Sequence, residues 1–123
     1  VIVSDHLPED EESKRLPFAQ AATGAIGIET LLPLALEMYH NESLSLNKII
    51  ETLTINPSKI LKINKGSLKK GADGDICIFD LEAPWKLNAE KLKSKSKNTA
   101  IEDRKLQGKV LMTFLNGELV FSQ

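Results

Sequence analysis

The spacing of apolar residues changes from helical to strand-like near residue 66. Before that point, Ser45 can cap a helix whose apolar positions follow at i, i+3, i+4 and i+7: Leu46, Ile49, Ile50 and Leu53. An earlier helix is predicted over residues 29–40, with Pro33 in its first turn or at a kink. Asn56 and Pro57 fit the N-cap and first position of a short third helix that ends before Gly66. The first half is therefore predicted to be mostly helical.

After residue 66 the chain reads as β-strands. The segments GADGDICIFD and GKVLMTFLNGELVF are rich in β-formers and are bounded by Gly and Asp. In the second segment one face holds Val110, Met112 and Phe114, and the other holds Leu111, Thr113 and Leu115. Asn116 and Gly117 tolerate the positive φ angles of a type I′ turn, so a hairpin is predicted there.

The first residues form a third pattern. Val1–Val3 are β-branched and predict a buried strand that ends at Ser4, where Asp5 and His6 follow directly. Strands usually end in turn residues, so an Asp-His pair at the tip is a candidate reactive group. Residues 7–25 then form a long connection, polar at first and later rich in Ala and Gly, of a length typical of functional or disordered loops. No Met precedes Val1, and we expect the chain to begin inside a larger protein.

Composition excludes several function classes. The 123 residues carry 16 basic and 17 acidic side chains, a net charge of -1, which argues against nucleic-acid or anionic-membrane partners attracted by bulk charge. Cys77 is the single cysteine and cannot form an internal disulfide, which favours a reducing, cytoplasmic compartment. No apolar run approaches the ~20 residues of a membrane helix, and no signal peptide is visible. The alternating lysines Lys91, Lys93, Lys95 and Lys97 indicate a solvated face.

Several motifs, taken in order, resemble a known family. They are SDHLPEDEESKRLPFAQAATGAIGIETLLPLAL, LTINPSKIL, GSLKKGADGDICIFDLEAPWKL, SKSKNTAI and LQGKVLMTFLNGELVF. Together they resemble the carboxy-terminal third of the dihydroorotases, members of the amidohydrolase superfamily, and are closest to the alphaproteobacterial type. The most specific pieces are Asp-His-x-Pro after a strand, Gly-x-x-Gly-x-Glu-Thr at 24–30 and Ser-x-x-x-Asn-Thr at 94–99.

The resemblance implies an α/β fold in two parts. Residues 1–66 would be the last βα unit and following helices of a metal-dependent-hydrolase (β/α)8 barrel, and residues 67–123 part of a small β-sandwich. Catalytic groups of such barrels lie at the carboxyl ends of the strands. Asp5, directly after the opening strand, would point into the mouth of the active site.

The resemblance also assigns roles to individual residues. Asp5 corresponds to the aspartate that binds zinc and carries the proton from an attacking water to the departing amide nitrogen. Thr23 and Gly24 match the segment whose backbone binds the substrate ring. Glu9 stands where many members have a substrate-contacting His; we expect its carboxylate to turn away from the anionic substrate.

The two histidines are not expected to bind metal. His6 should face away from Asp5 on a strand and serve packing or hydrogen bonding, whereas His40 should be a cation at a helix carboxyl end. The remaining zinc ligands would lie upstream of Val1, and the chain alone should be inactive and should associate as a homo-oligomer.

The predicted function is the reversible cyclisation of N-carbamoyl-L-aspartate to dihydroorotate in pyrimidine biosynthesis. Two alternatives stay open at this point. One is another cyclic amidohydrolase, such as a dihydropyrimidinase or an allantoinase. The other is a non-catalytic dihydroorotase-like subunit that supports aspartate transcarbamoylase.

Overall fold

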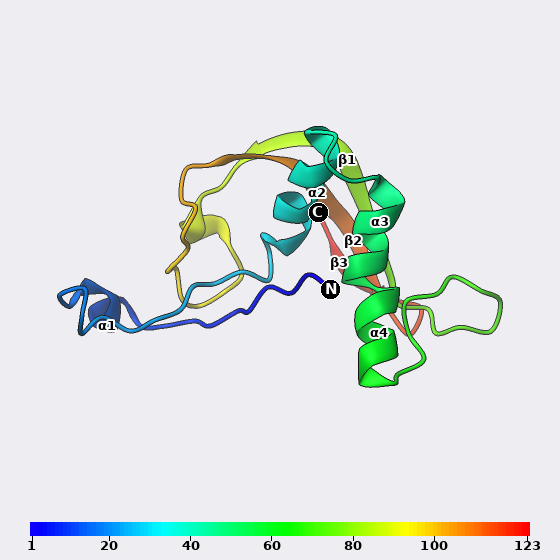
Figure 1. Cartoon of the computed structure of the whole chain (residues 1–123), viewed down its shortest axis with the longest axis horizontal. Helices are drawn as coiled ribbons and strands as arrows, with labels where there is room; N and C mark the ends of the chain where they lie inside the picture. The colour runs from blue at the N-terminus through cyan, green and yellow to red at the C-terminus, as the bar shows by residue number, and fades with distance from the viewer.

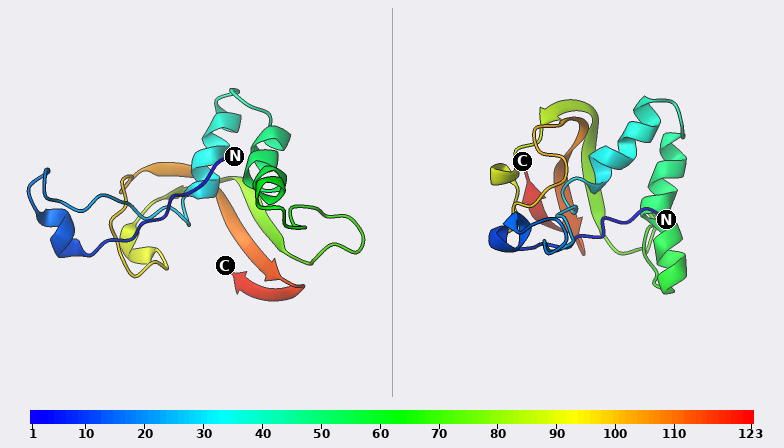
Figure 2. Two further views of the ribbon diagram at one scale, coloured as in Figure 1. Left: turned by 60° about the horizontal axis from the view of Figure 1, so that its bottom comes forward. Right: turned by 60° about the vertical axis from the view of Figure 1, so that its left-hand side comes forward.

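A computed structural model describes residues 1–123, with helices in the first half and an antiparallel sheet in the second (Figure 1). In chain order the elements are α1 (Glu11–Arg15), α2 (Leu31–His40), α3 (Leu46–Leu53), α4 (Ile55–Leu61), β1 (Ile76–Lys86), the 3-10 turn η1 (Ala89–Lys91), β2 (Lys105–Leu115) and β3 (Glu118–Ser122). Helices α2 to α4 lie together on one side of the sheet, whereas α1 stands apart on an extended arm (Figures 1 and 2).

Two of the predicted helices form close to their expected limits. The Ser45 hydroxyl accepts a hydrogen bond from the Lys48 N–H at 3.4 Å and caps α3, as predicted. Helix α2 begins at Leu31, two residues later than the predicted start at residue 29. Pro33 is its third residue and is buried, so its missing N–H falls in the first turn, where no intrahelical partner is needed.

The predicted start of the third helix was wrong by a few residues. Helix α4 begins at Ile55, with Asn56 and Pro57 inside its first turn rather than at the N-cap and first position. Thr54 separates α3 from α4 and gives its hydroxyl proton to the Ile50 carbonyl at 2.6 Å. Because Pro57 has no N–H to offer a carbonyl four residues earlier, a continuous helix through Thr54 would lose a hydrogen bond. The break at Thr54 follows from that loss.

The sheet has the order β1-β2-β3 and is antiparallel throughout. Leu115 pairs with Glu118 across a two-residue turn in which Asn116 and Gly117 have φ angles of 52° and 83°. The predicted type I′ hairpin is therefore confirmed.

Strand β1 runs to Lys86, beyond the predicted end at Asp80, and is interrupted by a bulge. The pairing shifts between Asp80 and Pro84, so that residues 81–83 lie opposite Gly108. The Asp80 carboxylate accepts hydrogen bonds from the N–H groups of Glu82 at 2.9 Å and Ala83 at 3.2 Å. This side chain thus stabilises the bulge by replacing the lost strand partners.

Helix α2 packs on β2 at the same point. Leu36 is fully buried, and a Cβ at Gly108 would lie 2.5 Å from the Leu36 Cδ1 atom. Gly108 also has a φ of 98°, which strongly favours glycine. The core is small, with 11 of 123 residues buried, and Leu36, Leu87 and Leu106 are among them.

The loop after α4 is joined to the hairpin by charged groups. The Lys65 ammonium lies 2.8 Å from the Asp73 carboxylate and 2.6 Å from that of Asp75. The other oxygen of Asp75 accepts the Asn116 N–H at 2.8 Å. The pKa of Asp75 is lowered mainly by the Lys65 ammonium and also by the Asn116 N–H. The Asp73 and Asp75 carboxylates raise the pKa of Lys65.

The predicted opening strand is absent. Residues 1–10 are irregular, and their backbone contacts with the rest of the chain include Ile2 N–H to the Thr52 carbonyl at 3.1 Å and Leu7 N–H to the Ala25 carbonyl at 3.0 Å. A strand needs a neighbouring strand for its ladder, and no other strand of the chain lies beside Val1–Val3. Within the long connection, α1 was not predicted, although Asp10 caps it by accepting the Ser13 N–H at 2.8 Å.

Candidate functional site

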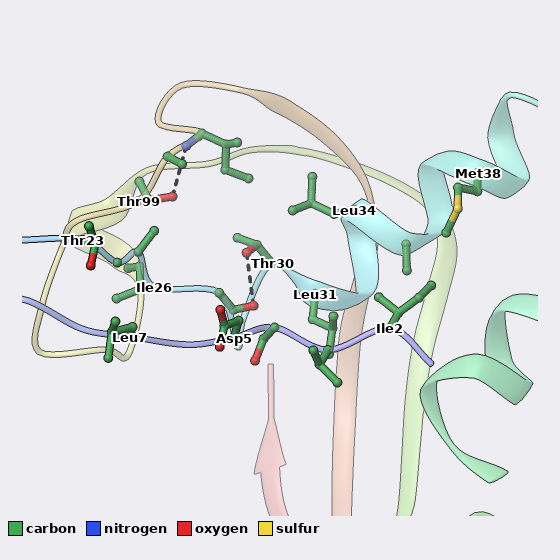
Figure 3. Close-up of a pocket in the computed structure, with 18 residues that line it drawn as sticks. Ile2, Asp5, Leu7, Thr23, Ile26, Thr30, Leu31, Leu34, Met38 and Thr99 are labelled. Carbon is green, nitrogen blue, oxygen red and sulfur yellow. Dashed lines mark hydrogen bonds between the residues drawn. The ribbon is translucent and has the colours of Figure 1, made fainter. Parts of the chain in front are cut away.

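A hollow of about 630 Å³ lies between the opening segment and the beginning of α2 (Figure 3). Its walls are mainly apolar, and Asp5 is its single charged lining residue. The polar lining is completed by Ser4, Thr23, Thr30 and Thr99. An apolar hollow with a few polar groups is the usual form of a small-molecule site.

Asp5 has a backbone conformation that is uncommon for a residue other than glycine. Its φ is 46°, in the left-handed region that Asp adopts more readily than most residues. The side chain is exposed and forms no hydrogen bond or ion pair within the chain. The backbone two residues later is held by the hydrogen bond from the Leu7 N–H to the Ala25 carbonyl. The Asp5 carboxylate is thus free to contact a ligand while its backbone is held in place.

His6 has the hydrogen-bonding position that was predicted for it. Its Nδ1 accepts the Gly27 N–H at 3.0 Å, so in the neutral ring the proton is on Nε2. This bond fixes the chain next to Asp5 against the segment that leads into α2. His40 ends α2 as predicted, with its ring edge-on to Tyr39 at 5.3 Å.

Thr23 and Gly24 line the same hollow as Asp5. Gly24 has a φ of 135°, and a Cβ there would lie 2.8 Å from the Leu7 carbonyl oxygen, so glycine is required. The Gly24 carbonyl accepts two hydrogen bonds, from the Lys14 ammonium at 3.0 Å and from the Asn98 amide nitrogen at 3.2 Å. Three of the four predicted site residues are therefore brought together.

Glu9, the fourth, lines a separate polar hollow of about 650 Å³. The side chains around it carry both signs of charge and include Asp10, Glu11, Lys14, Arg15, Glu90, Lys95 and Lys97. The Glu9 backbone is held by the segment 94–99: its N–H donates to the Asn98 side-chain oxygen at 3.3 Å, and its carbonyl accepts the Ser96 hydroxyl.

Asn98 was not predicted as a site residue. Beyond its bonds to Glu9 and Gly24, its own carbonyl accepts the Ile26 N–H at 3.2 Å. Nearby, the Glu29 carboxylate accepts the N–H groups of Lys93 at 2.7 Å and Ser94 at 3.2 Å. The motifs at 24–30 and 94–99 are thus in direct contact.

The chain does not contain a complete metal site. No group of three or more His, Cys, Asp or Glu side chains is arranged to hold an ion. Asp5 can supply one carboxylate ligand. Cys77 is a poor candidate nucleophile, because burial raises the pKa of its thiol. None of the helices has the length and apolar character needed to cross a bilayer.

Comparison with known proteins gives matches over nearly the whole chain. Residues 1–120 match the amidohydrolase family. A dihydroorotase of Ehrlichia canis, an alphaproteobacterium, is 42% identical over 121 residues, covering 98% of this chain and 27% of the relative. The chain thus spans about a quarter of that relative's length.

Solved structures agree on the fold. An L-hydantoinase (dihydropyrimidinase) from Arthrobacter aurescens matches with a TM-score of 0.77 at 31% identity, covering 85% of this chain and 24% of its own. A dihydropyrimidinase from Brevibacillus agri matches with a TM-score of 0.89 at 22% identity, covering 96% of this chain and 27% of its own. The expected fold class, the end of a hydrolase barrel with a small sheet attached, is confirmed by these neighbours.

Proposed function

The chain belongs to the amidohydrolase family, and on that basis we propose that it is the carboxy-terminal part of a zinc-dependent dihydroorotase. The reaction is the reversible cyclisation of N-carbamoyl-L-aspartate to dihydroorotate, a step of pyrimidine biosynthesis in the cytoplasm. Residues 1–66 would close the barrel and residues 67–123 would contribute to the sandwich. The observation that carries the proposal is the free Asp5 carboxylate in an apolar hollow also lined by Thr23 and Gly24.

Asp5 suits the role of ligand and proton carrier. Zinc, when bound, activates water for attack near neutral pH, and carboxylate oxygens are among its usual ligands. Asp5 would accept the proton of the attacking water and deliver it to the ring nitrogen that leaves. Its carboxylate has no competing partner in the chain, and the His6–Gly27 hydrogen bond steadies the adjacent backbone. The other zinc ligands would come from outside these 123 residues.

Gly24 and Thr23 would bind the ring. Backbone amides suit this task because the dihydroorotate ring presents alternating N–H and C=O groups. Glu9 contributes no contact in this proposal, since its side chain lies in the other hollow. The full protein would act as a homo-oligomer.

A second cyclic amidohydrolase activity has one observation in its favour. The structural relative at 31% identity is a hydantoinase, so dihydropyrimidinase activity is the nearest alternative. The higher identity of 42% to a dihydroorotase favours the first proposal. Assays of the longer protein with dihydroorotate, dihydrouracil and allantoin separate these activities, and absence of turnover with all three would favour a subunit that supports aspartate transcarbamoylase.

The test of the catalytic role is Asp5→Asn in the longer protein. The amide has nearly the same size and keeps an oxygen for the metal, but it cannot accept the proton of the attacking water. We expect turnover to fall by about 10²–10⁴-fold, the usual contribution of a general acid–base group. Turnover of dihydroorotate and zinc content are measured together.

Asp103→Asn is the matched control. Asp103 also has a left-handed backbone, with a φ of 61°, and lies on the surface in an ion pair with Lys86. Asp103→Asn should leave the turnover of dihydroorotate unchanged. If Asp5→Asn keeps its zinc and more than roughly a tenth of wild-type turnover, Asp5 has no proton-transfer role.

A further inference from the structure

The segment 94–99 lies far along the chain from Asp5, yet it contacts both segments that carry predicted substrate-site residues. Asn98 is 89 residues from Glu9 and 74 residues from Gly24 and is hydrogen-bonded to both. Its amide oxygen accepts the Glu9 N–H, and its amide nitrogen donates to the Gly24 carbonyl. A side-chain amide has both a donor and an acceptor. Asn98 can therefore bond an N–H group of one segment and a carbonyl group of the other.

A second donor acts on the same carbonyl. The Lys14 ammonium lies 3.0 Å from the Gly24 oxygen and 2.7 Å from the Ala22 oxygen. Charge-assisted bonds of this kind are stronger than bonds between neutral groups. The Gly24 carbonyl is therefore held from two directions, by α1 and by the segment 94–99.

Fixing that carbonyl fixes the next amide group. In a trans peptide the C=O of Gly24 and the N–H of Ala25 point in opposite directions. The Ala25 N–H accordingly points away from Asn98 and Lys14, and it has no hydrogen-bond partner within the chain. Gly24 and Ala25 both line the hollow that contains Asp5.

We propose that Asn98 is a positioning residue for the substrate site: by holding the Gly24 carbonyl and the Glu9 amide, it orients the Gly24–Ala25 peptide so that its free N–H meets a carbonyl of the cyclic amide. The inference rests on the proposed function, because it assigns Gly24 and its neighbour to ring binding. Asn98 touches no reacting atom in this scheme and acts only through the peptide it holds.

The first test uses amide hydrogen exchange in the longer protein. Asn98→Ala removes the side-chain bonds to Glu9 and Gly24, together with the one from the Ser96 hydroxyl, so peptides covering residues 7–10 and 24–27 should exchange faster than in the wild type. Asn88→Ala is the matched control: Asn88 also accepts a backbone N–H, that of Glu90 at 2.9 Å, but has no bond to residues 1–30. It should leave exchange in both peptides unchanged. Unchanged exchange in Asn98→Ala would overturn the proposed clamp.

The second test separates positioning from plain stability. Loss of one well-placed hydrogen bond to substrate should raise KM for dihydroorotate by roughly three- to tenfold in Asn98→Ala, with a smaller change in kcat. Asn98→Asp keeps the acceptor for Glu9 but loses the donor to Gly24, so it should raise KM in the same range. Faster exchange with an unchanged KM would show that Asn98 merely supports the fold and would overturn the inference.

Assays of the wild-type protein show whether the proposed function itself is wrong, independently of the role of Asn98. If it hydrolyses dihydrouracil or allantoin instead of dihydroorotate, the proposed substrate is wrong, and the same KM comparison with the active substrate decides the role of Asn98. If it turns over none of the three, the proposed function and the positioning role are both refuted.

Discussion

At the scale of single residues, Asp5 and Glu9 are close in sequence but line different hollows. The Glu9 backbone is held by Ser96 and Asn98, and its side chain shares its hollow with Lys14, Arg15, Lys95 and Lys97. This hollow is lined by acidic as well as basic residues, and Glu9 is not among the residues that line the apolar hollow. This placement supports the proposal that the Glu9 carboxylate turns away from the substrate.

Glu9→Gln in the longer protein should change KM for dihydroorotate by less than about threefold, or under ~1 kcal/mol. The substitution removes a charge without changing the backbone bonds that hold residue 9. Glu12→Gln, on the exposed surface of α1, is the control. A tenfold or larger gain in affinity would mean that the Glu9 carboxylate faces the substrate.

Local chemistry made some residue roles predictable. His6 was expected to serve packing or hydrogen bonding because it should face away from Asp5 on a strand; the strand is absent, but His6 does accept a hydrogen bond, from the Gly27 N–H. Asn98 could not be identified in this way, because its two partners are 89 and 74 residues away and nothing near it in sequence indicates them. Pairings over such distances depend on the folded chain rather than on local pattern.

At the scale of elements, the hairpin β2–β3 is tied to the loop after α4 by the cluster of Lys65, Asp73 and Asp75. The lowered pKa of Asp75 means that its contribution to stability is complete above the ordinary value of an aspartate, ~3.9, and is lost as the pH falls through the lowered value. The raised pKa of Lys65 means that its contribution is complete below the ordinary value of a lysine, ~10.4, and is lost as the pH rises beyond it.

Asp75→Asn should therefore lower the thermal unfolding midpoint at pH 7, and its difference from the wild type should shrink as the pH falls below ~3.9. Thermal melts followed by circular dichroism at several pH values measure this. Glu118→Gln, on the same hairpin and without an ion pair in the chain, should show no such pH-dependent difference. A constant difference between Asp75→Asn and wild type at all pH values would contradict the charge-based explanation.

Elements with their own local signals were predictable, and those that depend on partners were not. The turn at Asn116 and Gly117 and the cap at Ser45 are encoded within a few residues. The opening strand failed because a strand needs an adjacent strand. Strand β1 runs beyond the predicted end at Asp80 through a bulge, where the regular alternation of a strand is lost. The Asp80 bulge accommodates Pro84.

At the scale of the whole molecule, the 123 residues contain one candidate zinc ligand and no cluster of three. The isolated chain should therefore have no dihydroorotase activity and should bind zinc weakly, since zinc sites use three or more protein ligands. Turnover assays and zinc titration of the purified chain check this, with the longer protein as the positive control. Turnover by rigorously purified chain would contradict it.

The bulge in β1 has a consequence for how the sheet meets other chains. β1 is an edge strand, and the edge of a sheet can template pairing by a foreign strand, the first step towards aggregation. Pro84 has no N–H to present, and the N–H groups of Glu82 and Ala83 are already bonded to Asp80. Over residues 82–84 the bulge therefore leaves no free N–H for an incoming strand to bond, so a continuous ladder along β1 would be interrupted there.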